Sequence, residues 1–319
     1  MYRSTRRAPS RLRRFLVGVV GVAIVGGTLT TLAIATDTFG AGEMWMRVVN
    51  RVERFMAGPV PDRPTVATVR VTEPPPETEA PPDPTEAPAT TAPGKTVAPT
   101  PDPTPTPTPR PKKKKVDVDI VNNPKRVFAS QTRSDWCAPA GVQMALAVMS
   151  LVDTSNATQR EIGGRVREWE AYSDSRNGKW GPAAMALALE AYGAKGYEVR
   201  AFDTMTHALR DAAVAIKKTT SPVILLAWRG AHTWVMTGYR ADADPAKFRD
   251  SKISGAYILD PWYPRISSIW GPSNPPGTFT TIDELRENFL PWKRPEGKYP
   301  DRDGLWITVA PTKARAGTG

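Results

Sequence analysis

The stretch QTRSDWCAPAGVQMAL, residues 131–146, contains the only cysteine of the 319-residue chain. Pro139 is typical of a first helical turn. The apolar residues that follow at helical spacing are Val142, Leu146 and Met149. The pattern predicts a helix that begins at Cys137, where unsatisfied amide donors and the helix dipole favour a thiolate. The alternative is a small buried hydrophobic side chain, the usual state of a free cysteine.

Two histidines could act as the base for such a nucleophile. His232 opens a predicted strand, from which it can point into a cleft between sheet and helix. His207 is expected on the polar face of a predicted helix, facing water. We therefore take His232 as the candidate base.

Catalysis by an imidazole needs a partner that fixes its tautomer. Asp260 ends the run AYILD and precedes Pro261, so we expect its carboxylate to be held at a strand end. A turn-forming aspartate before proline is the alternative. Acyl transfer also needs donors for an oxyanion. Gln131, six residues before Cys137, could supply a side-chain amide, and Cys137 its own backbone N–H.

The rest of the C-terminal region alternates between helical and strand patterns. Helices are predicted at 158–172, 182–192, 203–218 and 281–290, the last opened by a capping box from Thr281 to Glu284. Strands are predicted at 196–202, 222–228, 232–239, 256–260, 265–270 and 305–310. Early helices and later antiparallel strands indicate an α+β domain with a helix packed on a sheet.

Four stretches, QTRSDWCAPAGVQM, NGKWGPAAMALALEAYG, PVILLAWRGAHTWVMTGY and ILDPWYP, together resemble the bacterial C39-like peptidase domain, a branch of the papain-like cysteine peptidase fold. The resemblance covers about residues 125–310. It implies a helix bearing Cys137 packed on an antiparallel sheet that bears His232 and Asp260. By the same resemblance Gln131 is the oxyanion donor, Cys137 the nucleophile, His232 the general base and acid, and Asp260 the orienting residue. No metal or organic cofactor is implied.

The chain departs from the family at two points. The family often has Asp-Cys-Gly, whereas Trp136 precedes Cys137 here and Ala138 follows it. Related domains fused to exporters cleave double-glycine leaders in the cytoplasm. This sequence shows no transporter segments, so that substrate is not carried over.

The function predicted is an extracytoplasmic, membrane-tethered cysteine peptidase that acts on a peptide or protein substrate. A catalytically silent module of the same fold, binding peptides or wall polymers, is one alternative. Transglutaminase-like or amidase acyl transfer is another, because Cys, His and Asp occur in that order there too. Tryptophans near the motifs could line a substrate groove or fill the core.

The N-terminal region predicts a membrane anchor. Residues 1–14 contain six arginines and no acid, and residues 15–36 are uncharged and mostly apolar. As a helix the second segment could span a hydrocarbon core of about 30 Å. The positive-inside bias then places the basic tail in the cytoplasm and the single-pass chain beyond it outside. The alternative is signal cleavage near Ala35 and secretion.

Two further segments precede the predicted peptidase domain, 116–319. Residues 37–58 are expected to form an amphipathic juxtamembrane segment on the outer membrane surface, and a short dimerising helix is the alternative. Residues 59–115 form a Pro/Thr-rich linker that ends in the lysine run 112–115, a candidate contact for an anionic wall polymer.

Composition excludes some classes of function and fold. The formal net charge of +11 lies mainly in the N-terminal third, so no nucleic-acid partner is indicated. A single cysteine excludes an intramolecular disulfide, so the domain has to be held by its core.

Overall fold

The computed structural model describes residues 66–72, 112–175 and 180–314, together with Val48, Val49, Val52, Phe55, Met56, Gly58 and Val60. The predicted basic tail and anchor, 1–36, lie outside the described residues, as do most of the amphipathic segment and of the linker. No helix among the described residues combines the length and apolar character that crossing a membrane requires.

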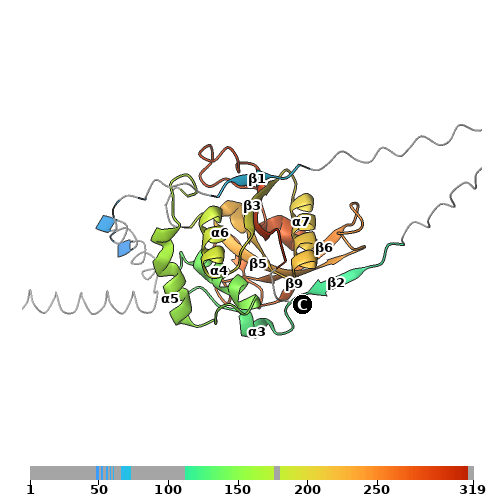
Figure 1. Ribbon diagram of the computed structural model, residues 1–319, viewed down its shortest axis with the longest axis horizontal. Coiled ribbons are helices and arrows are strands. Elements are labelled where there is room, and N and C mark those ends of the chain that lie inside the picture. Colours follow the sequence, from blue (N-terminus) through green and yellow to red (C-terminus); the bar gives the residue numbers. More distant parts are fainter. Residues whose placement is uncertain are drawn as a thin grey trace, which may run out of the picture.

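The centre of the domain is an eight-stranded sheet (Figure 1). Its main order is β1 (Thr68–Arg70), β3 (Tyr197–Phe202), β10 (Trp306–Pro311), β4 (Val223–Leu226), β5 (His232–Ala241), β6 (Ile253–Leu259) and β9 (Thr278–Thr281). The eighth strand, β2 (Val116–Asp119), pairs with the last part of β5, beyond the part that pairs with β4. All pairs are antiparallel except β1 with β3.

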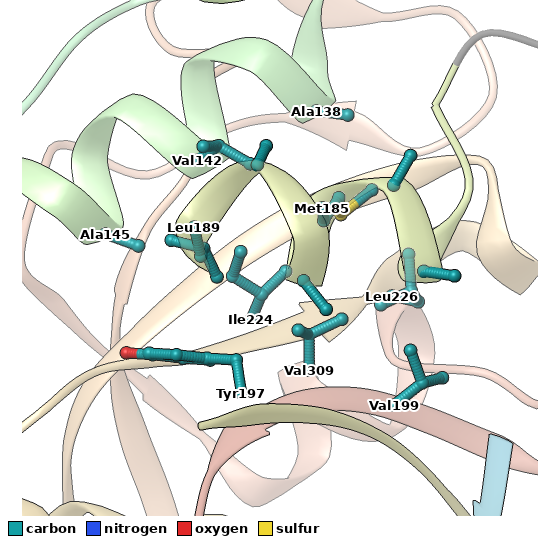
Figure 2. Close-up of a cluster of buried hydrophobic side chains, with 14 of the residues drawn as sticks. Ala138, Val142, Ala145, Met185, Leu189, Tyr197, Val199, Ile224, Leu226 and Val309 are labelled. Carbon is teal, nitrogen blue, oxygen red and sulfur yellow. The ribbon is translucent and has the colours of Figure 1, made fainter. Parts of the chain in front are cut away.

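Helices cover both faces of this sheet (Figure 1). On one face α4 (Cys137–Val148) and α6 (Pro182–Ala191) share a hydrophobic core with β3, β4 and β10. Figure 2 shows the side chains of these two helices directed at the strands, with Val142 and Leu189 above Ile224. On the other face α7 (Met205–Thr219) and α9 (Ile282–Asn288) pack on a second core. The mixed domain of helices packed on a mainly antiparallel sheet agrees with the predicted class.

Two smaller helices lie on the α4 side of the domain. The short α3 (Pro124–Val127) precedes α4, and α5 (Asn156–Gly164) packs against α4. The predicted helix 158–172 ends early at the Gly163-Gly164 pair, because glycine disfavours a helix interior. A 3₁₀ turn, Arg165–Glu168, continues from it.

Several predicted strands are also shorter in the structure. The predicted strand 222–228 ends at Leu226 and gives way to α8 (Ala227–Gly230). The predicted strand 265–270 is reduced to β7 (Ile266–Ser267), which pairs only with β8 (Gly271–Pro272). Four strands were not anticipated: β1, which lies within the predicted linker 59–115, and β2, β8 and β9.

One expectation about His207 was wrong. His207 lies on α7 as predicted, but its side chain is only 8% exposed. The ring packs edge-on against Phe202, with centroids 5.0 Å apart. Because β3 lies beside this face of the helix, the imidazole is buried instead of facing water.

Candidate active site

Cys137 is the first residue of α4, and its side chain is half-buried. Its thiol contacts the carbonyl oxygen of Ala231, 3.8 Å from Sγ, so the helix begins directly against the start of β5. The ring of Trp136, just before it, lies over Gly163 of α5, where a Cβ would come within 2.9 Å of the indole. The Arg133 guanidinium stacks on the same ring at 5.0 Å. Trp136 is therefore part of the contact between the loop and α5.

His232, the first residue of β5, and Asp260, which follows β6, form a buried pair. His232 is 2% exposed and Asp260 5%. The imidazole Nε2 lies 2.7 Å from Asp260 Oδ1. The same carboxylate oxygen accepts the N–H of Trp262 at 2.8 Å. Asp260 thus pairs with His232, as predicted, and also bonds within the turn before Trp262, the role that the sequence offered as an alternative.

The Cys137 thiol lies close enough to the imidazole to affect its protonation, so three groups come together here. Burial alone would lower the pKa of His232, but the charge of Asp260 and hydrogen bonds to Asp260 and Cys137 together raise it to about 9. Burial would likewise raise the pKa of Asp260, yet the charge and hydrogen bond of His232 hold it below its usual range. The site therefore favours a protonated imidazole between two acidic groups. Because Nε2 is bonded to Asp260, Nδ1 is the nitrogen left for Cys137.

Tryptophan rings enclose the imidazole. Trp228 stacks on His232 with centroids 3.9 Å apart and an interplanar angle of 18°, and Trp262 meets it edge-on at 6.3 Å. Trp228 has a left-handed backbone, φ 52° and ψ 46°, and its indole N–H donates to Asn288 Oδ1 at 3.0 Å. Sequence reasoning placed Trp228 near the motif but gave no signal for this stack.

Gln131 lies in the loop before Cys137, but its amide has other partners. Both N–H groups are directed at backbone carbonyls, of Arg133 at 2.8 Å and of Ser134 at 2.9 Å. Its buried Oε1 has no hydrogen-bond partner among the described residues. In this arrangement the side chain holds the loop and offers no free N–H to an oxyanion.

Two buried glutamines, which sequence reasoning missed, connect this loop to the segment between α4 and α5. Gln159 of α5 accepts the N–H and hydroxyl of Thr132 and donates to the carbonyl of Ser130 and to Gln143. Gln143, on α4, donates to the carbonyls of Asp153 and Ser155. Polar residues at buried helical positions are the signal that could have found them.

The structure thus brings Cys137, His232 and Asp260 together, with Gln131 close by. His207 lies on α7 and is no part of this group. Among the described residues no group of three or more His, Cys, Asp and Glu side chains could hold a metal ion.

Comparison with known proteins gives one structural match to report. No protein-family model matches the chain, and no curated protein matches it. The chain is similar to a crystal structure of a double glycine motif protease from an AMS/PCAT transporter in complex with the leader peptide. The match has 18% identity and a TM-score of 0.29, and covers 59% of this chain and 94% of that one. Both values are low, so the roles of the site residues have to be inferred from their geometry.

Proposed function

We propose that this chain is a cysteine peptidase of the papain-like, C39-like type, with Cys137 as nucleophile, His232 as general acid and base, and Asp260 as the residue that orients the imidazole. The observation that supports this most directly is a buried imidazole that is paired with a carboxylate at 2.7 Å and has the Cys137 thiol close enough to affect its pKa. A buried histidine charge needs such partners, and a nucleophilic cysteine needs such a base.

The reaction follows from the positions of these groups. The Cys137 thiolate attacks the peptide carbonyl carbon, and the oxyanion forms near the first turn of α4. The His232 imidazolium then gives its proton to the leaving amine, the C–N bond breaks, and an acyl thioester remains. Neutral His232 next takes a proton from water, which attacks the thioester and releases a carboxylic acid. The thiolate and the imidazolium are restored.

For the oxyanion we propose the backbone N–H of Cys137 as the principal donor, because the first amides of a helix have no intrahelical acceptor. Gln131 can add a second donor only by turning one N–H away from Arg133 or Ser134. Its predicted role therefore requires the loop to change its hydrogen bonds when substrate binds.

Alkylation of the single cysteine tests the proposed ion pair. At pH 6 a free thiol is only about 0.3% ionised, so we expect Cys137 to react with iodoacetamide at least about tenfold faster than glutathione does. His232→Ala should abolish the excess. His207→Ala, which removes the other histidine, should leave it in place. Equal rates for the wild type and glutathione would leave only a silent binding module.

Product analysis separates hydrolysis from acyl transfer. The purified full chain is incubated with peptide libraries, with and without added amines, and the products are identified by mass. We expect free carboxylates, lost in Cys137→Ala. Products found only as amine conjugates would replace the peptidase proposal with acyl transfer.

We also propose that residues 15–36 anchor the chain with the catalytic domain outside the cytoplasm; support for this comes from the sequence pattern alone. A membrane-impermeant maleimide added to intact cells should label Cys137. Labelling only after lysis would contradict this orientation.

A further inference from the structure

A pocket of about 230 Å³ lies beside the proposed catalytic group. It is lined by Trp228, Trp234 and Trp270, by Asp260, and by Glu284 and Glu287 of α9. Trp228 and Trp270 are parallel, with an interplanar angle of 5° and centroids 5.8 Å apart. The pocket therefore offers flat aromatic walls and carboxylates.

The charge of the pocket is unbalanced. Of the described residues that line it, none is a lysine or an arginine. Asp260 is matched by His232, and Glu284 uses one oxygen for the backbone N–H and hydroxyl of Thr281. No ion pair or hydrogen bond from the described residues reaches the Glu287 carboxylate. The pocket is thus locally negative on a chain with a net charge of +11.

A further polar group of the wall is also unmatched. Trp234 is 6% exposed, and its indole N–H has no acceptor among the described residues. This N–H is enclosed by the wall, so the groups that a ligand can reach are the carboxylates and the aromatic faces.

The position of the pocket relative to the thiol determines which residues of a bound substrate can reach the pocket. Asp260 is bonded to Nε2 of His232, and Nδ1 is the nitrogen left for Cys137. The pocket, which includes Asp260, therefore lies beyond the imidazole as seen from the sulfur. The imidazole protonates the leaving amine in the proposed reaction. Residues on the leaving side of the scissile bond therefore run towards the pocket.

We propose that this pocket binds the basic side chain, arginine in preference to lysine, of the first or second residue after the scissile bond. A planar guanidinium can stack on an indole while its N–H groups reach a carboxylate, whereas an ammonium cannot stack in this way. The position along the substrate rests on the proposed peptidase function. The affinity for a guanidinium does not.

A binding experiment tests the pocket without catalysis. Arginine amide is titrated into the purified full-length Cys137→Ala chain, and tryptophan fluorescence is followed because three indoles line the pocket. Citrulline amide, which has nearly the same shape without the charge, is the matched probe. We expect arginine amide to bind about tenfold more tightly than citrulline amide, and lysine amide to lie between them.

Substitutions in and near the pocket test whether arginine amide binds there. Glu287→Gln should weaken arginine amide about threefold, the usual size of an exposed charge pair. Asp283→Asn, on the same helix but paired with Arg286 outside the pocket, is the control and should change nothing. Trp270→Leu should weaken binding by removing one aromatic wall, which keeps the test decisive even if a helix variant folds poorly. Equal binding of arginine and citrulline amides would overturn the proposal.

Cleavage profiling with the active chain tests the position. We expect arginine to be enriched at the first or second site after the cleaved bond, and Glu287→Lys to remove that enrichment. Peptide hydrolysis with no basic preference and no arginine amide binding would overturn the pocket and leave the peptidase. Arginine amide binding that Glu287→Gln weakens, with no hydrolysis of any peptide, would support the pocket and refute the peptidase.

Discussion

His232 shows how a buried residue can carry charge in this protein. Transfer of an imidazolium out of water is unfavourable, and the ring is 2% exposed. Asp260, bonded to Nε2, and the nearby Cys137 offset that cost, while the stacked ring of Trp228 keeps water from the pair. A change in any of these neighbours should therefore appear first in the titration of the imidazole.

Asp260→Asn should move the alkaline limit of peptide hydrolysis. With its pKa raised to about 9, wild-type His232 keeps the proton for the leaving amine up to about pH 9, and activity falls above that pH. Without the carboxylate, burial, which lowers the pKa of His232, is opposed only by the nearby Cys137, so the pKa falls and the limit should shift below neutrality. We expect a loss at pH 7 of about 10²-fold or more, measured as kcat/KM against pH.

The control is Asp283→Asn, an exposed carboxylate paired with Arg286 on the surface of α9, which should keep the wild-type profile. An unchanged alkaline limit in Asp260→Asn would mean that the carboxylate does not set the protonation of His232.

The location of these three residues could be predicted because each lies at a boundary that the sequence marks. Pro139 marks the start of α4, and Pro261 marks the end of β6. The position of the Trp228 ring could not be predicted, since it combines a left-handed backbone with a hydrogen bond to Asn288, 60 positions along the chain. The bonding of Gln131 was missed for a similar reason, because a candidate donor in a sequence carries no information about competing carbonyls nearby.

At the level of elements, the site depends on how closely α4 approaches β5. Gly141, one turn after Cys137, lies against Thr233, and a Cβ at 141 would overlap the Thr233 methyl group, Cγ2. Thr233 follows His232 in β5. The absence of a side chain at position 141 therefore sets the separation between the helix that carries the thiol and the strand that carries the imidazole.

Gly141→Ala should lower the reactivity of Cys137 strongly while it changes the free energy of unfolding only modestly. Alanine favours a helix over glycine by about 1 kcal/mol, which partly offsets an overpacking cost of about 1–3 kcal/mol. The shift of α4 should still move the sulfur from the imidazole, and we expect the excess alkylation rate at pH 6 to fall about tenfold or more.

A second substitution checks the cause. Thr233→Ser removes the overlapping methyl group and should restore much of the rate in the double variant. Gly164→Ala, at the end of α5 where no atom lies within 4 Å of the added Cβ, should have no effect. A double variant as slow as Gly141→Ala would show that the overlap is not the cause.

Elements with strong local signals could be predicted from the sequence. The amphipathic pattern of α7 and the capping box of α9 are both present in the structure. Strands β1, β2 and β9 are held by their partners, β3, β5 and β6, and their short segments carry little pattern of their own. His207 was misjudged because the polar face of α7 lies beside β3, which a helical pattern does not reveal.

At the scale of the whole molecule, β1 joins the predicted linker to the core. Arg302, 2% exposed, forms an ion pair with fully buried Asp174 at 2.9 Å. Asp174 accepts the backbone N–H groups of Ala183 and Ala184 at the start of α6. The Nε–H of Arg302 donates to Thr68 Oγ1 of β1 at 2.9 Å. A residue far before the predicted domain boundary thus completes the partners of a buried charge.

Thr68→Val should destabilise the domain although it preserves shape and strand preference. It removes the hydrogen-bond acceptor of Arg302 Nε and leaves the Asp301 carboxylate, 3.8 Å away, as a partner of that atom. Loss of the hydrogen bond of a buried donor costs roughly 1–3 kcal/mol. Thr72→Val, just beyond β1 on an exposed residue, is the matched control. The free energy of unfolding from denaturant titration measures both, and equal values would show that β1 contributes no bond to the core.

The same contact determines where the folded unit begins. A chain that starts at residue 112 keeps the whole predicted domain, 116–319, but loses β1, its pairing with β3 and the Thr68 acceptor. A chain that starts at residue 60 keeps them. We expect the longer chain to be more stable than the shorter one by at least the cost of Thr68→Val, because the pairing is lost as well. Since β1 and β2 belong to one sheet, the proline-rich stretch between them begins and ends on the domain. An anchor at 15–36 would therefore connect to the domain through the residues before β1. Equal stability of the two chains would instead mean that the folded domain begins at residue 116 and that the whole stretch 59–115 is a spacer.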